Sequence, residues 1–183
     1  MPSSSVAVIT GGSSGIGAEV ARLLTAFGAR VIGTSRHERP VEHVDELVRP
    51  DEIASVAGRV DAVVVALPGT AATERMLGRA FFDAARPGLV VVNVGRGTVI
   101  DEPALLDALA AERVGFAALD VTAVEPLPQD SPLWTHPRVL ISPHTAALTT
   151  GEERRIAELF ADNATRLLDG RPLRNRVDTV DFY

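Results

Sequence analysis

The sequence of 183 residues contains no cysteine and no lysine, so all 18 of its basic residues are arginine. The absence of cysteine excludes disulfides, thiolate zinc sites and thiol catalysis. The absence of lysine excludes Schiff-base chemistry, a phosphate-binding P-loop and a Tyr-x-x-x-Lys pair. No apolar run approaches the roughly 18 residues of a membrane span, and the first residues have no basic signal region. The net charge of −6 makes nucleic acid an unlikely partner. We expect a cytoplasmic protein with no membrane partner.

Apolar runs alternate with segments of helical periodicity along the chain. Strands are predicted at 6–9, 30–34, 62–67, 89–94, 115–121 and 139–142, and helices over 73–85 and 102–111, with others ending at Phe27 and Asp169. All-apolar strands that alternate with helices predict an α/β fold, a Rossmann-type doubly wound parallel sheet. We expect a single domain over residues 1–183, with a final helix and tail at 151–183. The charged segment 36–50 is predicted to be a loop.

A glycine-rich loop, TGGSSGIG, lies between the first predicted strand and the first predicted helix. A dinucleotide fold places its phosphate-binding turn here, because the backbone can approach a pyrophosphate and the helix N-terminus offers free N–H groups. The spacing is similar to the TGxxxGxG loop of short-chain dehydrogenases. The alternative is a turn that only packs strand against helix. The residues predicted to bind the cofactor are Gly12, Ser14, Gly15 and Ile16.

The second predicted strand ends at Thr34, and Ser35 and Arg36 follow it, where a dinucleotide fold usually carries an acidic residue. A carboxylate there would bind the ribose hydroxyls and repel a 2′-phosphate. A hydroxyl beside a guanidinium would instead bind that phosphate. Ser35 and Arg36 therefore favour NADP over NAD, with NAD as the other cofactor considered. The alternative for Arg36 is an ordinary surface arginine.

Three polar features follow apolar strands in the second half of the chain. They are Arg96 between two glycines, Asp120 with Glu125 just beyond it, and His144 after a proline. Arginine can clamp a carboxylate, histidine exchanges protons near neutral pH, and a nearby glutamate orients the imidazole ring. Together they suit a 2-oxo acid, which has a carboxylate to hold and a carbonyl to protonate. Taken singly, each residue could be a surface charge, loop filler or a turn histidine.

At this point the chain resembles the NAD(P)-binding domain of the D-isomer-specific 2-hydroxyacid dehydrogenases. The resemblance is carried by VVVALPGTAATERML, VVVNVGRGTVIDEPALLDAL, GFAALDVTAVEPLPQDSPLW and VLISPHTAALT. It implies that Arg96 binds substrate, that His144 protonates the carbonyl oxygen, and that Glu125 pairs with that histidine. It also implies a cofactor site that includes Leu67, Pro68, Val94, Gly95 and Asp120. The Ser35-Arg36 pair is similar to the residues at this position in glyoxylate or hydroxypyruvate reductases, which often use NADPH.

The chain departs from this family in two ways. Because the sequence begins at the first strand of the cofactor domain, we expect it to lack the family's substrate domain and its site to be open to water. The glycine loop is also two residues longer than that of the family. Activity of the isolated chain is therefore doubtful, and a non-catalytic dinucleotide-binding module or truncated orphan domain is the main alternative. A short-chain dehydrogenase is disfavoured by the absence of lysine and by a single tyrosine at the terminus. The apolar residues of the final helix are expected to be exposed or buried in a homodimer.

Overall fold

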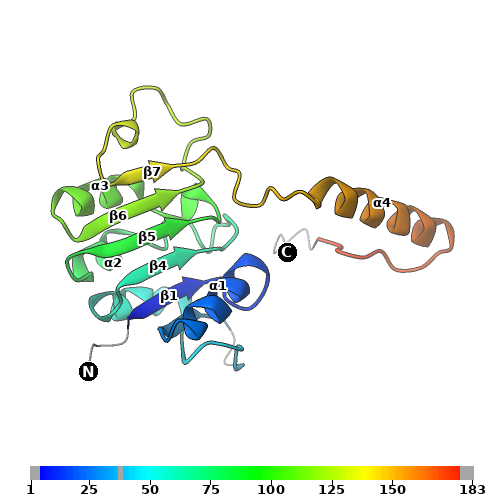
Figure 1. Ribbon diagram of the computed structural model, residues 1–183, viewed down its shortest axis with the longest axis horizontal. Coiled ribbons are helices and arrows are strands. Elements are labelled where there is room, and N and C mark those ends of the chain that lie inside the picture. The colour runs from blue at the N-terminus through cyan, green and yellow to red at the C-terminus, as the bar shows by residue number, and fades with distance from the viewer. Residues whose placement is uncertain (1–4, 37–38, 178–183) are drawn as a thin grey trace. The chain divides into compact units, whose positions relative to one another are not determined.

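The computed structural model describes residues 5–36 and 39–177. The chain divides into two compact units, with the boundary between His144 and Thr145. The first unit is built on a sheet and the second on one long helix (Figure 1). Within the described residues, none of the helices has the length and apolar character needed to cross a membrane.

The first unit contains one sheet of seven parallel strands, in the order β3-β2-β1-β4-β5-β6-β7. This is the predicted Rossmann-type arrangement, and it places the carboxyl ends of all strands along one edge. The strand order reverses direction between β1 and β4, where such sheets bind their ligands. The strands are β1 Val6–Thr10, β2 Arg30–Thr34, β3 Glu46–Val48, β4 Ala62–Val65, β5 Leu89–Asn93, β6 Val114–Leu119 and β7 Val139–Ile141.

Helices pack on the sheet from both sides. Alternate residues of a strand point to opposite faces, and the core divides accordingly. Ala21 of α1 (Gly15–Ala26) packs with Ile9 and Val31, whereas Val8 and Ile32 belong to a larger cluster on the other face. That larger cluster includes apolar residues of the remaining elements between the strands. These are the 3₁₀ helices η1 Pro50–Arg59, η2 Gly97–Val99 and η3 Pro132–Trp134, and the α-helices α2 Arg79–Ala84 and α3 Glu102–Ala110.

The helix predicted over 73–85 is wrong in its first half, because only α2 (79–84) is helical. The Thr73 hydroxyl binds the Pro68 carbonyl at 2.7 Å. The amides of Arg75 and Leu77 donate to the carbonyls of Thr98 and Val99 at 2.8 and 3.1 Å. Backbone groups that would close helical turns are therefore used to join this segment to residues 98–100.

The loop predicted over 36–50 is also wrong in part, because it contains strand β3. Ile32 to Thr34 pair with Glu46 to Val48, which extends the sheet by one strand. Glu46 then binds Arg30 of β2 at 2.9 Å and also Arg59 of η1. These two ion pairs hold the short polar strand at the edge of the sheet.

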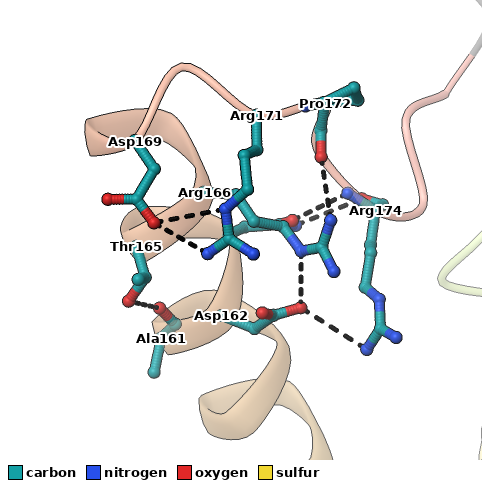
Figure 2. A network of polar contacts seen from close by, with 9 residues as sticks. Ala161, Asp162, Thr165, Arg166, Asp169, Arg171, Pro172 and Arg174 are labelled. Carbon is teal, nitrogen blue, oxygen red and sulfur yellow. Dashed lines mark hydrogen bonds and ion pairs between the residues drawn. The ribbon is translucent and has the colours of Figure 1, made fainter.

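The second unit consists of α4 (Glu152–Leu168) and the segment that turns back along it, as predicted for the final helix. The Asn163 side chain exchanges two hydrogen bonds with the backbone of Arg174, at 2.8 and 3.1 Å. Asp162 accepts from Arg166 at 2.9 Å and lies 3.4 Å from the Arg174 guanidinium (Figure 2). The hydrogen bond from Arg166 is the main reason why the pKa of Asp162 is lowered. These polar contacts fix the returning segment on the helix.

Candidate active site

The residues predicted to form the site follow the carboxyl ends of the strands, in loops or, for Gly15 and Ile16, in the first turn of α1. Thr10, Thr34 and Val65 end β1, β2 and β4, and Asn93 and Leu119 end β5 and β6. The loops of the first half follow β1, β2 and β4, and those of the second half follow β5, β6 and β7. A parallel sheet thus brings six segments, far apart in the sequence, to one edge.

Glu125 and His144 are in direct contact. His144 Nδ1 lies 2.9 Å from Glu125 Oε2, and the two side chains are 46% and 40% exposed. The other carboxylate oxygen of Glu125 accepts a hydrogen bond from the Thr122 amide at 3.1 Å. A carboxylate at Nδ1 favours the tautomer with the proton on that nitrogen. The imidazole therefore presents Nε2 away from the glutamate, as an acid–base group open to a ligand.

The backbone of His144 is held by the two neighbouring strands. Its amide donates to the carbonyls of Asp120 and Ser142 at 2.9 and 3.0 Å. Asp120 is buried, and its carboxylate accepts from the Ser142 hydroxyl. His144 has a φ of 55°, a left-handed conformation that costs a non-glycine residue roughly 1–2 kcal/mol. The hydrogen bonds at the ends of β6 and β7 hold the histidine in that conformation.

Arg96 lies in a turn that the side chain of Asn93 closes. Asn93 is buried, and its amide group accepts from the Gly95 N–H at 3.0 Å and donates to the Arg96 carbonyl at 3.1 Å. The guanidinium donates to the Gly95 carbonyl at 2.7 Å, and the side chain is exposed. This turn presents a cation at the carboxyl end of β5.

The Arg96 turn and the Glu125 loop touch through their backbones. A Cβ atom placed on Gly97 would lie 1.9 Å from the carbonyl carbon of Thr122. Only glycine permits this approach. Since Thr122 also binds Glu125, the segments that carry Arg96, Glu125 and His144 form one connected group of loops. Sequence reasoning predicted these three residues, and the structure places their loops together.

The glycine loop closes tightly between β1 and α1. A Cβ atom on Gly17 would lie 2.2 Å from the Gly11 carbonyl oxygen, so the loop packs backbone against backbone. Within the described residues, the Ser14 side chain does not cap α1, and the first helical turn has no acidic residue. Gly12 is buried, and Ser14, Gly15 and Ile16 are exposed. The longer loop therefore still offers helix N–H groups to an anion, which fits a dinucleotide pyrophosphate.

The other predicted cofactor residues lie along the same edge. Leu67 and Pro68 follow β4 and are partly buried, and Gly95 packs against the Leu67 backbone, with its virtual Cβ 2.5 Å from the Leu67 oxygen. Val94 donates its amide to Val65 at 3.0 Å. These contacts place the β4 and β5 loops side by side.

Ser35 and Arg36 follow β2 on the far side of the glycine loop. The Ser35 amide donates to the Val48 carbonyl of β3 at 3.0 Å, and Arg36 is exposed. Beyond them, residues 37 and 38 lie outside the described part of the chain. The predicted 2′-phosphate contacts therefore lie at the end of β2, where the fold places the ribose of a dinucleotide.

Sequence reasoning missed the residues that connect the site. Glu102, at the start of α3, accepts a hydrogen bond from the amide of Ala123, 21 residues away. Thr122 stabilises the same loop through its hydroxyl, which donates to the Val124 carbonyl at 2.9 Å. No spacing rule in the sequence indicates such a contact, because it depends on how the β5 and β6 loops meet.

The sheet order, the glycine loop and the acid–base pair together define a dinucleotide-binding domain with an acid–base group at its ligand edge. The chain belongs to the D-isomer specific 2-hydroxyacid dehydrogenases, because the model of their NAD binding domain matches residues 3–146. This confirms the resemblance in the sequence.

Among curated relatives, glyoxylate/hydroxypyruvate reductase A of Salmonella typhimurium is 34% identical over 172 residues, which are 94% of this chain and 54% of the relative. A solved NADPH-dependent glyoxylate/hydroxypyruvate reductase from Sinorhizobium meliloti, in complex with NADP and sulfate, superposes with a TM-score of 0.86 at 33% identity. That match covers 98% of this chain and 57% of the other.

A second solved structure is the D-isomer specific 2-hydroxyacid dehydrogenase of Xanthobacter autotrophicus Py2, in complex with NADPH and MES. It superposes with a TM-score of 0.87 at 33% identity, and the match covers 98% of this chain and 73% of the Xanthobacter chain. The chain spans about half the length of the curated relatives it matches, between 54% and 57% of each.

Proposed function

We propose that this chain is the cofactor-binding half of an enzyme that interconverts small 2-oxo and 2-hydroxy acids. The observation that carries the proposal is the Glu125–His144 contact of 2.9 Å, at the same sheet edge as the glycine loop. A dinucleotide lying along that edge from the loop after β1 would bring its nicotinamide end to the loops after β4, β5 and β6.

Each residue has a distinct role in this proposal. A nicotinamide cofactor held by the loops after β1, β2, β4 and β5 would supply, when bound, the hydride for the C2 carbonyl. Arg96 binds the substrate carboxylate and polarises the carbonyl through its guanidinium. His144 donates a proton from Nε2 to the carbonyl oxygen as that oxygen gains negative charge, and Glu125 balances the charge of the imidazolium. Hydride and proton together convert the 2-oxo acid to a 2-hydroxy acid.

The proposed cofactor is NADP in preference to NAD. Ser35 and Arg36 support it, because a hydroxyl and a guanidinium at the end of β2 suit a 2′-phosphate. We expect tighter binding of NADPH than of NADH, and Arg36→Ala should weaken NADPH binding about tenfold while leaving NADH binding little changed. Arg22→Ala is the matched control, since Arg22 is an exposed arginine paired with Glu19 at 2.6 Å. Tighter binding of NADH to the unchanged chain would contradict the preference.

A non-catalytic dinucleotide-binding module is the second candidate. The exposure of the His144 and Glu125 side chains, 46% and 40%, favours it for the chain by itself. Water around the pair weakens its electrostatic effect on a developing charge. We therefore expect the chain alone to bind cofactor and to have weak turnover or none.

The deciding experiment measures oxidation of NADPH by glyoxylate, hydroxypyruvate or pyruvate. If the chain turns over, His144→Ala should lower kcat by about 10²–10⁴-fold, the usual contribution of a general acid. His136→Ala is the control, because His136 accepts from the Arg138 amide near β7 and has no role in the proposal. Cofactor binding without oxidation dependent on His144 would favour the binding module. Neither binding nor oxidation would contradict both candidates.

We further propose that two chains pair through α4 and that the protein acts in the cytoplasm. Large apolar residues on α4 support the pairing, since Ile156, Phe160 and Leu167 are exposed by 61%, 75% and 68%. An exposed apolar stripe of this size commonly marks a protein–protein contact. The cytoplasmic location is supported by the proposed cofactor, because NADP and NADPH are intracellular metabolites.

A further inference from the structure

Glu102 uses its side chain for a contact outside its own helix. It is the first residue of α3, where an acidic group usually interacts with the helix N-terminus. The preceding residue, Asp101, already caps this helix by accepting from the Ala104 amide at 3.2 Å. Glu102 Oε1 instead accepts the Ala123 amide at 2.5 Å. The carboxylate thus joins α3 to the loop after β6.

The amide bound by Glu102 adjoins the amide that binds Glu125. Ala123 N–H donates to Glu102, and Thr122 N–H donates to Glu125 Oε1 at 3.1 Å. The Thr122 hydroxyl closes the same turn on the Val124 carbonyl, and Gly97 packs beneath it. Loss of the Ala123–Glu102 hydrogen bond would free the Thr122–Ala123 peptide to rotate. The adjoining Val121–Thr122 peptide, whose N–H binds Glu125, would then shift with it and change the orientation of the Glu125 carboxylate toward His144.

We propose that Glu102 is a positioning residue that fixes the Thr122–Ala123 backbone and, through it, the orientation of Glu125 against His144. The contact between Glu125 and His144 can be measured in a chain that has no activity. The catalytic importance of Glu102 rests on the proposed function. The proposed positioning effect is specific to Glu102 among the acidic residues of α3. Asp107 of the same helix pairs instead with Arg79 of α2 at 2.6 Å.

The test reads the tautomer of His144, which reports the Glu125 contact directly. ¹⁵N chemical shifts of the imidazole, measured where the ring is neutral, distinguish a proton on Nδ1 from one on Nε2. The unchanged chain should show the Nδ1–H form. Glu125→Ala should lose that signature, which confirms the assignment. Both measurements are made on the chain without cofactor or substrate.

Glu102→Ala should also lose the Nδ1–H signature, giving a mixture of tautomers in a chain that is still folded. Glu102→Gln should restore it, because the amide oxygen also accepts a hydrogen bond from Ala123. Asp107→Ala is the matched control and should leave the signature unchanged. Should Glu102→Ala fail to fold, Glu102→Asp replaces it, since its shorter side chain cannot reach the amide. A folded Glu102→Ala or Glu102→Asp chain that retains the Nδ1–H form would overturn the proposal.

An activity measurement then separates positioning from cofactor binding. In a chain that turns over, Glu102→Ala should lower kcat about tenfold to a hundredfold while leaving the KM for NADPH unchanged, because misplacement of a reacting group affects the chemical step. Loss of the tautomer signature without any turnover in the unchanged chain would sustain the role of Glu102 and count against the catalytic function. A fall in NADPH affinity with kcat unchanged would count against Glu102 as a positioning residue.

Discussion

Gly97 joins the two loops that carry Arg96 and Glu125, and it does so by having no side chain. The carbonyl carbon and oxygen of Thr122 would lie 1.9 and 2.0 Å from a Cβ atom at this position. These are backbone atoms, so a rotamer change cannot relieve the overlap. One of the two loops would have to move.

Gly97→Ala should therefore destabilise the chain by about 1–3 kcal/mol, the usual cost of forcing an extra group into a packed site. The free energy of unfolding in urea measures this. Gly12→Ala is the matched control, since a Cβ atom there would lie 3.7 Å from its nearest neighbour. Equal stabilities for the two variants would show that the loops are not packed as described.

At the scale of residues, the sequence predicts the groups that carry chemistry but not those that connect them. Glu125 and His144 could be predicted because a carboxylate and an imidazole both follow apolar strands, where together they suit acid–base chemistry, and because the segments around them resemble the family. Their contact is present in the structure, while their roles stay predictions. Glu102 and Thr122 were missed because a hydrogen bond between a helix start and a distant loop leaves no periodic signal.

At the scale of elements, Glu46 stabilises the edge of the sheet by binding arginines of β2 and η1. Its hydrogen bond with Arg59 is the main cause that lowers the pKa of Glu46 from the ordinary 4.5, opposed by desolvation. Because the folded-state pKa lies below the unfolded one, the carboxylate stabilises the fold above pH 4.5. That stabilisation is lost as the pH falls through the folded-state value.

Glu46→Gln should thus lower the free energy of unfolding by about 1 kcal/mol at neutral pH, the upper end for exposed ion pairs. The difference from the unchanged chain should shrink as unfolding is measured at successively lower pH below 4.5. Glu112→Gln is the control, since Glu112 is 79% exposed and lies 3.5 Å from Arg138. A difference that is constant with pH would contradict the role given to the carboxylate.

Most strands are predictable because a parallel sheet covered on both faces needs continuous apolar runs. The strand β3 is the exception, since it is a three-residue edge strand, ELV, held by ion pairs. The helix prediction over 73–85 was wrong in its first half for a different reason. Its periodicity was helical, but the amides of residues 75 and 77 bond to the carbonyls of residues 98 and 99, in the 3₁₀ helix η2. Such tertiary contacts override a local pattern.

At the scale of the whole molecule, the exposed apolar residues of α4 predict self-association. Sedimentation equilibrium should show a dimer for the unchanged chain, and Phe160→Asp should weaken the dimer at least about tenfold, because burial of this side chain is worth about 1.5–3 kcal/mol. Glu158→Gln on the same helix is the control and should leave association unchanged. A chain that stays monomeric at every concentration would contradict the proposed pairing.

The central claim is that a dinucleotide lies along the carboxyl ends of the strands, from the glycine loop to the Glu125–His144 pair. The most direct test is an NMR titration of the labelled chain with NADPH. The account predicts that shift changes concentrate at Gly12, Gly15, Arg36, Gly95 and His144, and that residues at the opposite sheet edge stay unchanged. Shift changes confined to α4, or none at millimolar NADPH, would contradict it.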